Sequence, residues 1–383
     1  MKTNQGLNTI CVHEGDVEDQ TYKGAISPIY PATAYAYQGQ EDSAYPRYFN
    51  TPNQANLAKK IARLEHAELG LIFGSGMATI SSAMLSVLKS GDHVIVQNQI
   101  YGGTRNFIKK ELENYSVKYD FVDLNDEKAV EALIQPNTKL IYLETPSNPL
   151  MELVDLKKIA QIAKAHNLIT MADNTFATPI NQTPIDFGID IVVHSATKYL
   201  GGHSDITAGA VATSKTLIEP ILHKAQNFGG SLSDQTTWLL ERSMKTLNLR
   251  IQRQNKNATE LANFLYHRDW IEQVFYPGLE THSQFDLAQS QMSGFGGMLS
   301  FKLIKEISTT AFLKELKLVK DVLSLGGVET TILSPAKTSH SLLSDEERQA
   351  QGINNQVLRL SCGIENVEDI IDDFNHSLKH NLT

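Results

Sequence analysis

The sequence has few cysteines, no long apolar segment and no excess of basic residues. Only two of its 383 residues are cysteine, Cys11 and Cys362, which excludes a disulfide framework and is typical of a reduced compartment such as the cytoplasm. These thiols match no zinc motif, and none of the 12 histidines shows a metal-ligand spacing, so we expect no metal site. No apolar run reaches about 18 residues and the first residues are not apolar, so we expect neither a membrane span nor a secretory signal. The 34 Lys and Arg residues are outnumbered by 43 Asp and Glu, and this net charge of −9 argues against a nucleic-acid partner.

Length and composition instead predict a folded chain of two domains behind an N-terminal arm. Hydrophobic residues make up 41% and charged residues 20% of the chain, which excludes intrinsic disorder as its main state. A single hydrophobic core rarely exceeds roughly 250–300 residues, so a chain of 383 residues favours two domains. Residues 1–52 show little periodicity and carry Pro28, Pro31 and Pro46 among several tyrosines, which predicts an extended arm rather than a helical bundle.

Residues 53–245 alternate short apolar runs with helical patterns. The apolar runs are nearly continuous, as in strands buried on both faces of a sheet. They span 93–97, 139–144, 168–173 and 189–195. Helical spacing marks 54–68, 78–88 and 155–166. This alternation predicts an α/β domain with a mostly parallel sheet.

Residues 246–383 alternate less regularly, which is typical of a smaller α+β domain. We expect a long helix over 233–267, then a glycine-rich segment over 293–303 and an amphipathic helix near 308–318. A late strand over 358–365 precedes a final helix.

Three features of residues 53–245 could form a site. Lys198 follows an apolar strand, where burial would lower the pKa of its amine and make it a nucleophile, although a solvated surface lysine is the usual alternative. Asp173 ends the preceding strand, at the sheet edge where open α/β sheets bind ligands, but a helix cap would also explain it. Gly74, Ser75 and Gly76 directly precede a helix, whose free N–H groups attract anions, although many tight turns look the same.

Together these features suit pyridoxal 5′-phosphate (PLP). The lysine would form a Schiff base with the cofactor, and the helix N-terminus would hold its phosphate. The aspartate would pair with the pyridine nitrogen and keep it protonated, so that the ring acts as an electron sink.

The chain resembles the Cys/Met-metabolism (trans-sulfuration) family of PLP-dependent enzymes from about Ile26 to the last helix. This family includes cystathionine γ-synthases, cystathionine γ- and β-lyases, methionine γ-lyases and O-acylhomoserine sulfhydrylases. The matching motifs are Tyr45-Pro46-Arg47, Ser75-Gly76-Met77, Tyr101-Gly102-Gly103-Thr104, Glu144-Thr145-Pro146-Ser147-Asn148-Pro149, Ala172-Asp173-Asn174-Thr175, Ser195-Ala196-Thr197-Lys198-Tyr199, Ser324-Leu325-Gly326-Gly327-Val328-Glu329 and Arg359-Leu360-Ser361 followed by Gly363-Ile364-Glu365. Single residues of this set have structural explanations, but so many motifs in one order are hard to obtain by chance.

The resemblance implies the aspartate-aminotransferase fold (PLP fold type I), with a larger domain, a smaller one and a homotetramer built from two tight dimers. It implies two catalytic residues: Lys198, which holds the cofactor and then moves protons at Cα and Cβ, and Tyr101, which stacks on the ring and assists proton transfer to the leaving group. The residues implied to hold the cofactor are Gly76, Met77, Tyr101, Asn148, Asp173, Ser195, Thr197 and Lys198, with Tyr45 and Arg47 reaching the phosphate of the neighbouring subunit. Those implied to bind substrate are Arg359, Ser324, Glu329 and Asn148. Among them, Arg359 would grip the α-carboxylate with its two-point fork.

Substrate choice depends on positions where the chain departs from its relatives. Several cystathionine-processing members carry an acidic residue where this chain has Ala44, and an arginine where it has Asn106, next to Arg105. Methionine γ-lyases usually carry a cysteine where this chain has Gly103, while Glu329 keeps the acidic residue of many γ-specific members. These departures suggest a C–S lyase of broader or shorter-substrate preference.

Three functions are therefore open. We favour a lyase that eliminates at Cγ or Cβ of cystathionine, methionine, homocysteine or cysteine-type substrates and releases a thiol, ammonia and a 2-oxo acid. The alternative is a γ-replacement transferase, either a cystathionine γ-synthase or an O-acylhomoserine sulfhydrylase. A non-catalytic protein of the same fold is the third, and the presence of Lys198, Asp173, Tyr101 and Arg359 argues against it.

Overall fold

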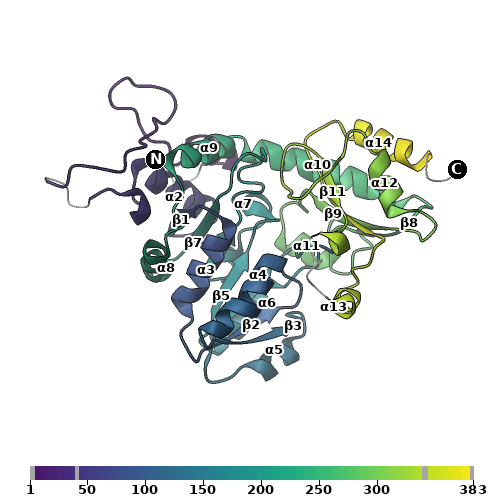
Figure 1. The fold of residues 1–383 in the computed structure, drawn as a ribbon, viewed down its shortest axis with the longest axis horizontal. Coiled ribbons are helices and arrows are strands. Elements are labelled where there is room, and N and C mark those ends of the chain that lie inside the picture. The colour runs from purple at the N-terminus through teal and green to yellow at the C-terminus, as the bar shows by residue number, and fades with distance from the viewer. Residues whose placement is uncertain (1–4, 39–42, 339–343, 380–383) are drawn as a thin grey trace.

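Two β-sheets organise the computed structural model, which describes residues 5–38, 43–338 and 344–379 (Figure 1). Within these ranges a seven-stranded sheet has the order β1-β7-β6-β5-β4-β2-β3, and a five-stranded sheet has the order β10-β11-β12-β9-β8. The strands of the larger sheet are β1 (Leu69–Phe73), β2 (His93–Gln97), β3 (Lys118–Val122), β4 (Thr138–Glu144), β5 (Ile169–Asp173), β6 (Ile191–His194) and β7 (Gly209–Thr213). Those of the smaller sheet are β8 (Ile271–Phe275), β9 (Met298–Leu303), β10 (Lys320–Asp321), β11 (Thr331–Leu333) and β12 (Val357–Ser361).

The larger sheet is mostly parallel, which confirms the prediction. Every neighbouring pair from β6 through β5, β4 and β2 to β3 is parallel. Only β7 among the described strands of this sheet runs against its neighbours, β6 and β1. The four apolar runs appear as β2, β4, β5 and β6, and every residue of β2 and β6 is buried, as expected for strands covered on both faces.

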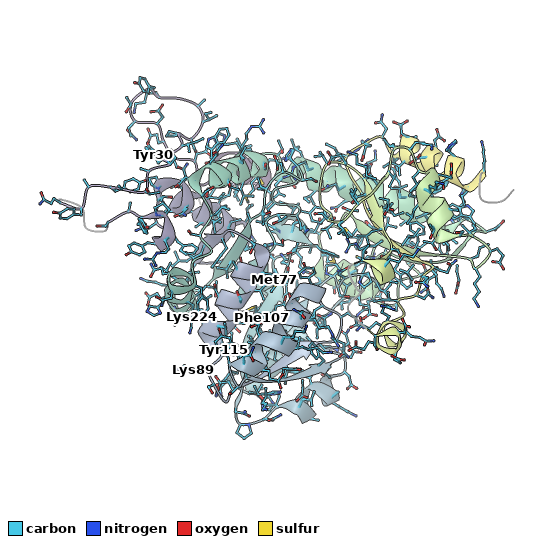
Figure 2. The ribbon with its side chains drawn as sticks, viewed as in Figure 1. Tyr30, Met77, Lys89, Phe107, Tyr115 and Lys224 are labelled. Carbon is cyan, nitrogen blue, oxygen red and sulfur yellow. The ribbon has the colours of Figure 1, made fainter. Side chains whose placement is uncertain are left out.

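Helices cover both faces of the larger sheet. The helices of the described residues are α1 (Leu7–His13), η1 (Pro46–Tyr48), α2 (Pro52–Leu64), α3 (Gly76–Val87), α4 (Gly102–Asn106), η2 (Phe107–Leu112), α5 (Glu127–Leu133), α6 (Leu156–Ala165), α7 (Thr178–Asn181), η3 (Pro184–Phe187), α8 (Lys215–Phe228), α9 (Asp234–Met244), α10 (Leu247–Tyr266), α11 (Phe285–Gln291), α12 (Thr309–Glu315), η4 (Pro335–Lys337), α13 (Asp345–Ala350) and α14 (Val367–Lys379). One face packs against α3, η2 and α8, and Met77 and Phe107, labelled in Figure 2, belong to this layer. The other face packs against α2, α5 and α6. Successive strand residues alternate between the two layers, so Val193 of β6 faces the first and Val192 the second.

The smaller sheet has a hydrophobic core of its own. Side chains of β9 and β12 pack with those of α10, α12 and α14, and Phe301, Phe312 and Phe374 meet at its centre with ring centroids 5.7–6.4 Å apart. Two separate cores agree with the predicted pair of domains, while the boundaries at residues 52 and 245 stay predictions. No helix in the described ranges is both long and apolar enough to cross a bilayer.

The predicted long helix over 233–267 is wrong, because two helices occupy this segment. α9 ends at Met244 and α10 begins at Leu247. The guanidinium of Arg250 is buried and its Nη2 donates to the carbonyl of Ser243 at 3.0 Å, which therefore does not accept the next helical bond. A tertiary contact, not a glycine or proline, breaks the helix.

The N-terminal arm is extended apart from two short helices, α1 and η1, so the expectation of an arm without helix is only partly correct. α1 buries Ile10 and Cys11 against α2 and α10, and the Nζ of Lys60 donates to the carbonyl of Cys11 at 2.9 Å. The arm then leaves the body of the protein (Figure 1), and Tyr22 and Tyr37 are 87% and 73% exposed.

Candidate active site

A cavity of about 860 Å³ opens at the carboxyl ends of the parallel strands, where the larger and smaller domains meet. Most of the residues predicted to form the site line it. These are Gly76, Met77, Tyr101, Asn148, Asp173, Ser195, Thr197, Lys198, Ser324 and Arg359. They come from segments that are far apart in the sequence, and the sheet topology brings their carboxyl-terminal ends to one edge.

The N-terminus of α3 forms an anion-binding corner. Ser75 caps the helix by accepting the N–H of Ala78, which leaves the N–H groups of Gly76 and Met77 directed away from the helix. A Cβ at Gly76 would lie 2.8 Å from the Cβ of Ser195, so only glycine allows the helix end to approach that side chain. The corner therefore places backbone donors beside the hydroxyl of Ser195.

Thr197 also lies at this corner, but its hydroxyl is engaged. It donates to the carbonyl of Ala208 at 3.1 Å and accepts the N–H of Ala208 at 2.9 Å. The predicted contact of Thr197 with a phosphate therefore requires its hydroxyl proton to turn from that carbonyl towards the cavity.

Lys198 lies just past β6, in the cavity wall. Its Nζ donates to the Oγ of Ser324, a residue of the smaller domain, at 2.9 Å. Burial and the nearby guanidinium of Arg359 lower the pKa of Lys198 from 10.5 to about 8. A substantial fraction of these amines is therefore neutral near pH 8, as a nucleophile or a base requires.

Asp173 ends β5 with its carboxylate at the same edge of the sheet. Its Oδ1 accepts the N–H of Thr175 at 2.9 Å and the hydroxyl of Thr175 at 2.5 Å. Burial raises the pKa of Asp173, and the two hydrogen bonds from Thr175 partly counter this effect. A protonated ring nitrogen facing Asp173 would favour its charged form, so the site suits a cationic heterocycle.

Arg359, on β12, is a buried cation that meets no carboxylate in an ion pair within the described residues. Its Nη1 donates to the side-chain oxygen of Asn148 at 2.9 Å, and its Nη2 to the carbonyl of Ser324 at 3.4 Å. Burial lowers its pKa from 12.5 to about 10, so the side chain is still charged at neutral pH. A buried guanidinium with only neutral acceptors is suited to a carboxylate that arrives with a ligand.

Tyr101 presents its ring to the cavity from the N-terminal end of α4. The ring is 47% exposed and lies so close to Gly103 that a Cβ there would be 2.5 Å from the ring's Cε1 atom. The backbone N–H of Tyr101 donates to the Oε2 of Glu144 at 2.8 Å.

Glu144 is a cavity residue to which the sequence reasoning gave no role. It ends β4 in register with Asp173 on β5, so two carboxyl groups meet at the sheet edge. Burial raises its pKa well above the usual value, and Asp173 raises it further. A signal was available, because Glu144 closes the apolar run 139–144 just as Asp173 closes 168–173.

Three predicted residues lie outside the cavity lining. Tyr45 and Arg47 belong to the arm, and the Nη1 of Arg47 donates to the carbonyl of Gln226 at 2.6 Å. Glu329 lies near Gly327, at which a Cβ would be 3.1 Å from its Oε2. Arg105 is also absent from the lining, because its guanidinium stacks on Phe121 with 4.1 Å to the ring centroid.

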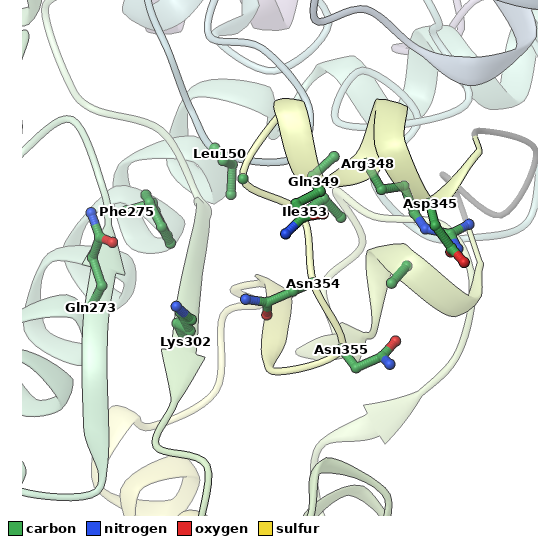
Figure 3. A pocket seen from close by; sticks show the side chains of 12 residues that line it. Leu150, Gln273, Phe275, Lys302, Asp345, Arg348, Gln349, Ile353, Asn354 and Asn355 are labelled. Carbon is green, nitrogen blue, oxygen red and sulfur yellow. The ribbon is translucent and has the colours of Figure 1, made fainter.

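A second cavity, of about 460 Å³, lies against β8, β9 and α13 (Figure 3). Its cations already have partners, since Lys302 pairs with Glu272 at 2.6 Å and Arg348 pairs with Asp345. None of the predicted site residues is among the described residues that line it. No group of three or more His, Cys, Asp or Glu side chains that could hold a metal occurs in the described ranges.

Comparison with known proteins agrees with this geometry. The chain belongs to the family described as Cys/Met metabolism PLP-dependent enzyme, whose model matches residues 8–379. It is 42% identical over 378 residues to a cystathionine beta-lyase of Lactococcus lactis, covering 97% of this chain and 99% of that one. It is 40% identical to a cystathionine gamma-synthase/O-acetylhomoserine (thiol)-lyase of Bacillus subtilis, covering 98% and 97%. The structure of a Lactobacillus plantarum cystathionine gamma-lyase complexed with L-serine superimposes with a TM-score of 0.95 at 39% identity, covering 98% of this chain and 99% of that one.

These matches confirm the predicted PLP fold type I and identify PLP as the cofactor. The cavity fits PLP on its own terms: the corner at Gly76 and Ser195 suits a phosphate, Asp173 suits the pyridine nitrogen and Lys198 suits the aldehyde. The protein is therefore a PLP-dependent enzyme of sulfur amino-acid metabolism.

Proposed function

We propose that the protein is a carbon–sulfur lyase that eliminates at Cγ or Cβ of a sulfur amino acid. The observation that carries this proposal is the bridge made by Ser324. Its hydroxyl accepts from Lys198, and its carbonyl accepts from Arg359. A carboxylate bound by Arg359 would thus hold the α-carbon of an amino acid next to the amine of Lys198.

Each residue then has a defined task. Arg359 binds the α-carboxylate, and Asn148 keeps the guanidinium in place through its side-chain oxygen. Lys198 in its neutral form accepts the α-proton, since its lowered pKa of about 8 favours that form. The hydroxyl of Tyr101 passes a proton to the departing sulfur. PLP, when bound, supplies the electron sink for the pair left at the α-carbon.

A lyase is favoured by the names of the relatives, which include a cystathionine beta-lyase at 42% identity and a cystathionine gamma-lyase structure at 39%. A γ-replacement transferase is the second candidate, because a synthase relative is 40% identical over nearly the same length. Both reactions need the same base and the same carboxylate site. They differ in whether an added thiol captures the unsaturated γ-intermediate.

Product analysis separates the two. The holoenzyme is incubated with L-cystathionine, L-methionine, L-homocysteine, L-cysteine and O-acetyl- or O-succinyl-L-homoserine, each with and without a thiol acceptor. We expect 2-oxobutyrate or pyruvate from the sulfur amino acids and little from the acylhomoserines. A thioether formed from acylhomoserine and cysteine, with 2-oxobutyrate suppressed, would identify a transferase instead. The Lys198→Ala variant is the control and should form neither product.

Assembly is part of the same proposal. Tyr45 and Arg47 lie outside this chain's own cavity, on an arm that leaves the body of the protein, which supports their predicted role at the phosphate of a neighbouring subunit. The homotetramer and the cytoplasmic location stay predictions. Small-angle scattering or sedimentation would test the first, and fractionation of the source cells the second.

A further inference from the structure

Glu144 contacts the loop that carries Tyr101, at one oxygen, and the core of the sheet, at the other. Its Oε2 accepts the backbone N–H of Tyr101 at 2.8 Å. Its Oε1 accepts the hydroxyl of Tyr142, a fully buried residue of β4, at 3.1 Å. The Glu144 side chain is 6% exposed and makes no ion pair within the described residues. A carboxyl group buried at this cost is retained only where its hydrogen bonds matter.

The contact matters because little else fixes the Tyr101 ring. Tyr101 caps α4 without a side-chain hydrogen bond to the helix, and its ring projects into the cavity. The same helix is fixed further along by Arg105, whose Nη1 donates to the carbonyl of Asn98 at 3.1 Å. Between these points, the bond to Glu144 sets where the backbone of Tyr101 lies, and therefore the height of its ring above the sheet edge.

We infer that Glu144 is a positioning residue, which places the Tyr101 ring over the cofactor by holding its backbone amide. This inference rests on the proposed function, because it takes the cofactor ring to lie between Tyr101 and Asp173. The carbonyl-type oxygen of Glu144 does the work, and its charge is not needed. The raised pKa of Glu144 beside Asp173 agrees with a group that is not held as an isolated anion.

The distinction between acceptor and charge defines the variants. Glu144→Gln keeps an oxygen for the Tyr101 amide and turns its NH₂ towards Tyr142, whose hydroxyl can accept as well as donate. Glu144→Ala removes the acceptor. Gly103→Ala displaces the ring from its other side, because the added methyl would lie 2.5 Å from the ring. Glu152→Gln is the matched control, since Glu152 is also a partly buried carboxyl with a raised pKa but lies outside the cavity lining.

Two readouts follow ring placement. The first is circular dichroism in the visible band of the bound cofactor, which reports the asymmetry around its ring and needs no turnover. The second is kcat, measured together with KM. We expect Glu144→Ala and Gly103→Ala to change the visible dichroism in the same way and to lower kcat by about 100-fold, as misplacement of a catalytic group by an ångström does. Glu144→Gln and Glu152→Gln should keep the wild-type dichroism and kcat.

A double variant tests the route of the effect. In a Tyr101→Ala background, Glu144→Ala should cause little further loss of kcat, because the two changes remove one function. Losses that multiply, or a Glu144→Gln variant as impaired as Glu144→Ala, would overturn the inference. If the wild-type chain takes up no PLP at all, the proposed function fails. If it takes up PLP and Glu144→Ala leaves the dichroism unchanged, only the role of Glu144 fails.

Discussion

Replacement of Arg359 by lysine probes the carboxylate site without removing its charge. The arginine fork reaches Asn148 with one nitrogen and the Ser324 carbonyl with the other, and still presents donors to the cavity. A lysine has one ammonium group at the end of a flexible stem and cannot keep both protein contacts while binding a carboxylate at two points. Arg359→Lys should therefore lose at least one charge-assisted hydrogen bond to the substrate.

The size of the effect follows from that one bond. A hydrogen bond to a charged group contributes about 1.5–3 kcal/mol, and 1.4 kcal/mol corresponds to a factor of ten, so kcat/KM should fall by about 10- to 150-fold. Most of the loss should appear as a higher KM, because the carboxylate is bound before and after the proton moves. The affinity for PLP should change little, since the phosphate corner at Gly76 and Ser195 is separate from Arg359.

Steady-state kinetics with L-cystathionine and L-methionine, together with a PLP titration followed by absorbance, measure both quantities. Arg250→Lys is the matched control. Arg250 is also a buried arginine whose pKa is lowered to about 10, but it donates to the carbonyls of Tyr199 and Ser243 and lies outside the cavity lining. It should lower the melting temperature and leave KM near the wild-type value. Equal loss of PLP affinity and kcat/KM in Arg359→Lys would refute the carboxylate role.

Three further variants or conditions test other parts of the account. Covalent capture of PLP by the apoprotein should accelerate as the pH rises through about 8, because only the neutral amine of Lys198 attacks, and stopped-flow absorbance that places the midpoint near the ordinary 10.5 would contradict the assigned burial. Mixed oligomers of Arg47→Ala and Lys198→Ala chains should recover activity through one intact site, whereas no recovery would argue against sites shared between subunits. Phe301→Ala removes a fully buried ring from the core of the smaller domain and should lower the free energy of unfolding by about 3–5 kcal/mol, as denaturant titration would show.

Local patterns predicted the elements that are buried on both faces. The run 93–97 is β2 with the same bounds, because helices cover both sides of this strand and each of its side chains must be apolar or internally bonded. The antiparallel direction of β7 carries no comparable signal, since it depends on the connection from β6 through the loop that holds Lys198. Strand direction is a property of chain topology rather than of residue pattern.

Elements fixed by tertiary contacts were missed or drawn wrongly. The segment 233–267 has continuous helical character, and only the approach of Arg250 to the carbonyl of Ser243 divides it. The seven residues of α1 are too few to be stable alone and depend on the packing of Ile10 against α2 and α10.

The site could be predicted further than the fold, because motifs of the resemblance name its residues one at a time. Tyr45 and Arg47 show the limit of one chain, since their predicted partner lies on another subunit. Glu144 shows a different limit. It belongs to a matching motif, but its importance arises from the amide of Tyr101, 43 residues away in the sequence.

The reaction of the holoenzyme with L-cystathionine alone tests the central claim most directly. Each molecule consumed should release one ammonia, one 2-oxo acid and one amino thiol, with water as the co-reactant. Pyruvate with homocysteine would identify cleavage at Cβ, and 2-oxobutyrate with cysteine would identify cleavage at Cγ. If cystathionine stays intact while acylhomoserine and cysteine combine to form it, the protein is a γ-replacement transferase and the claim of a lyase is wrong.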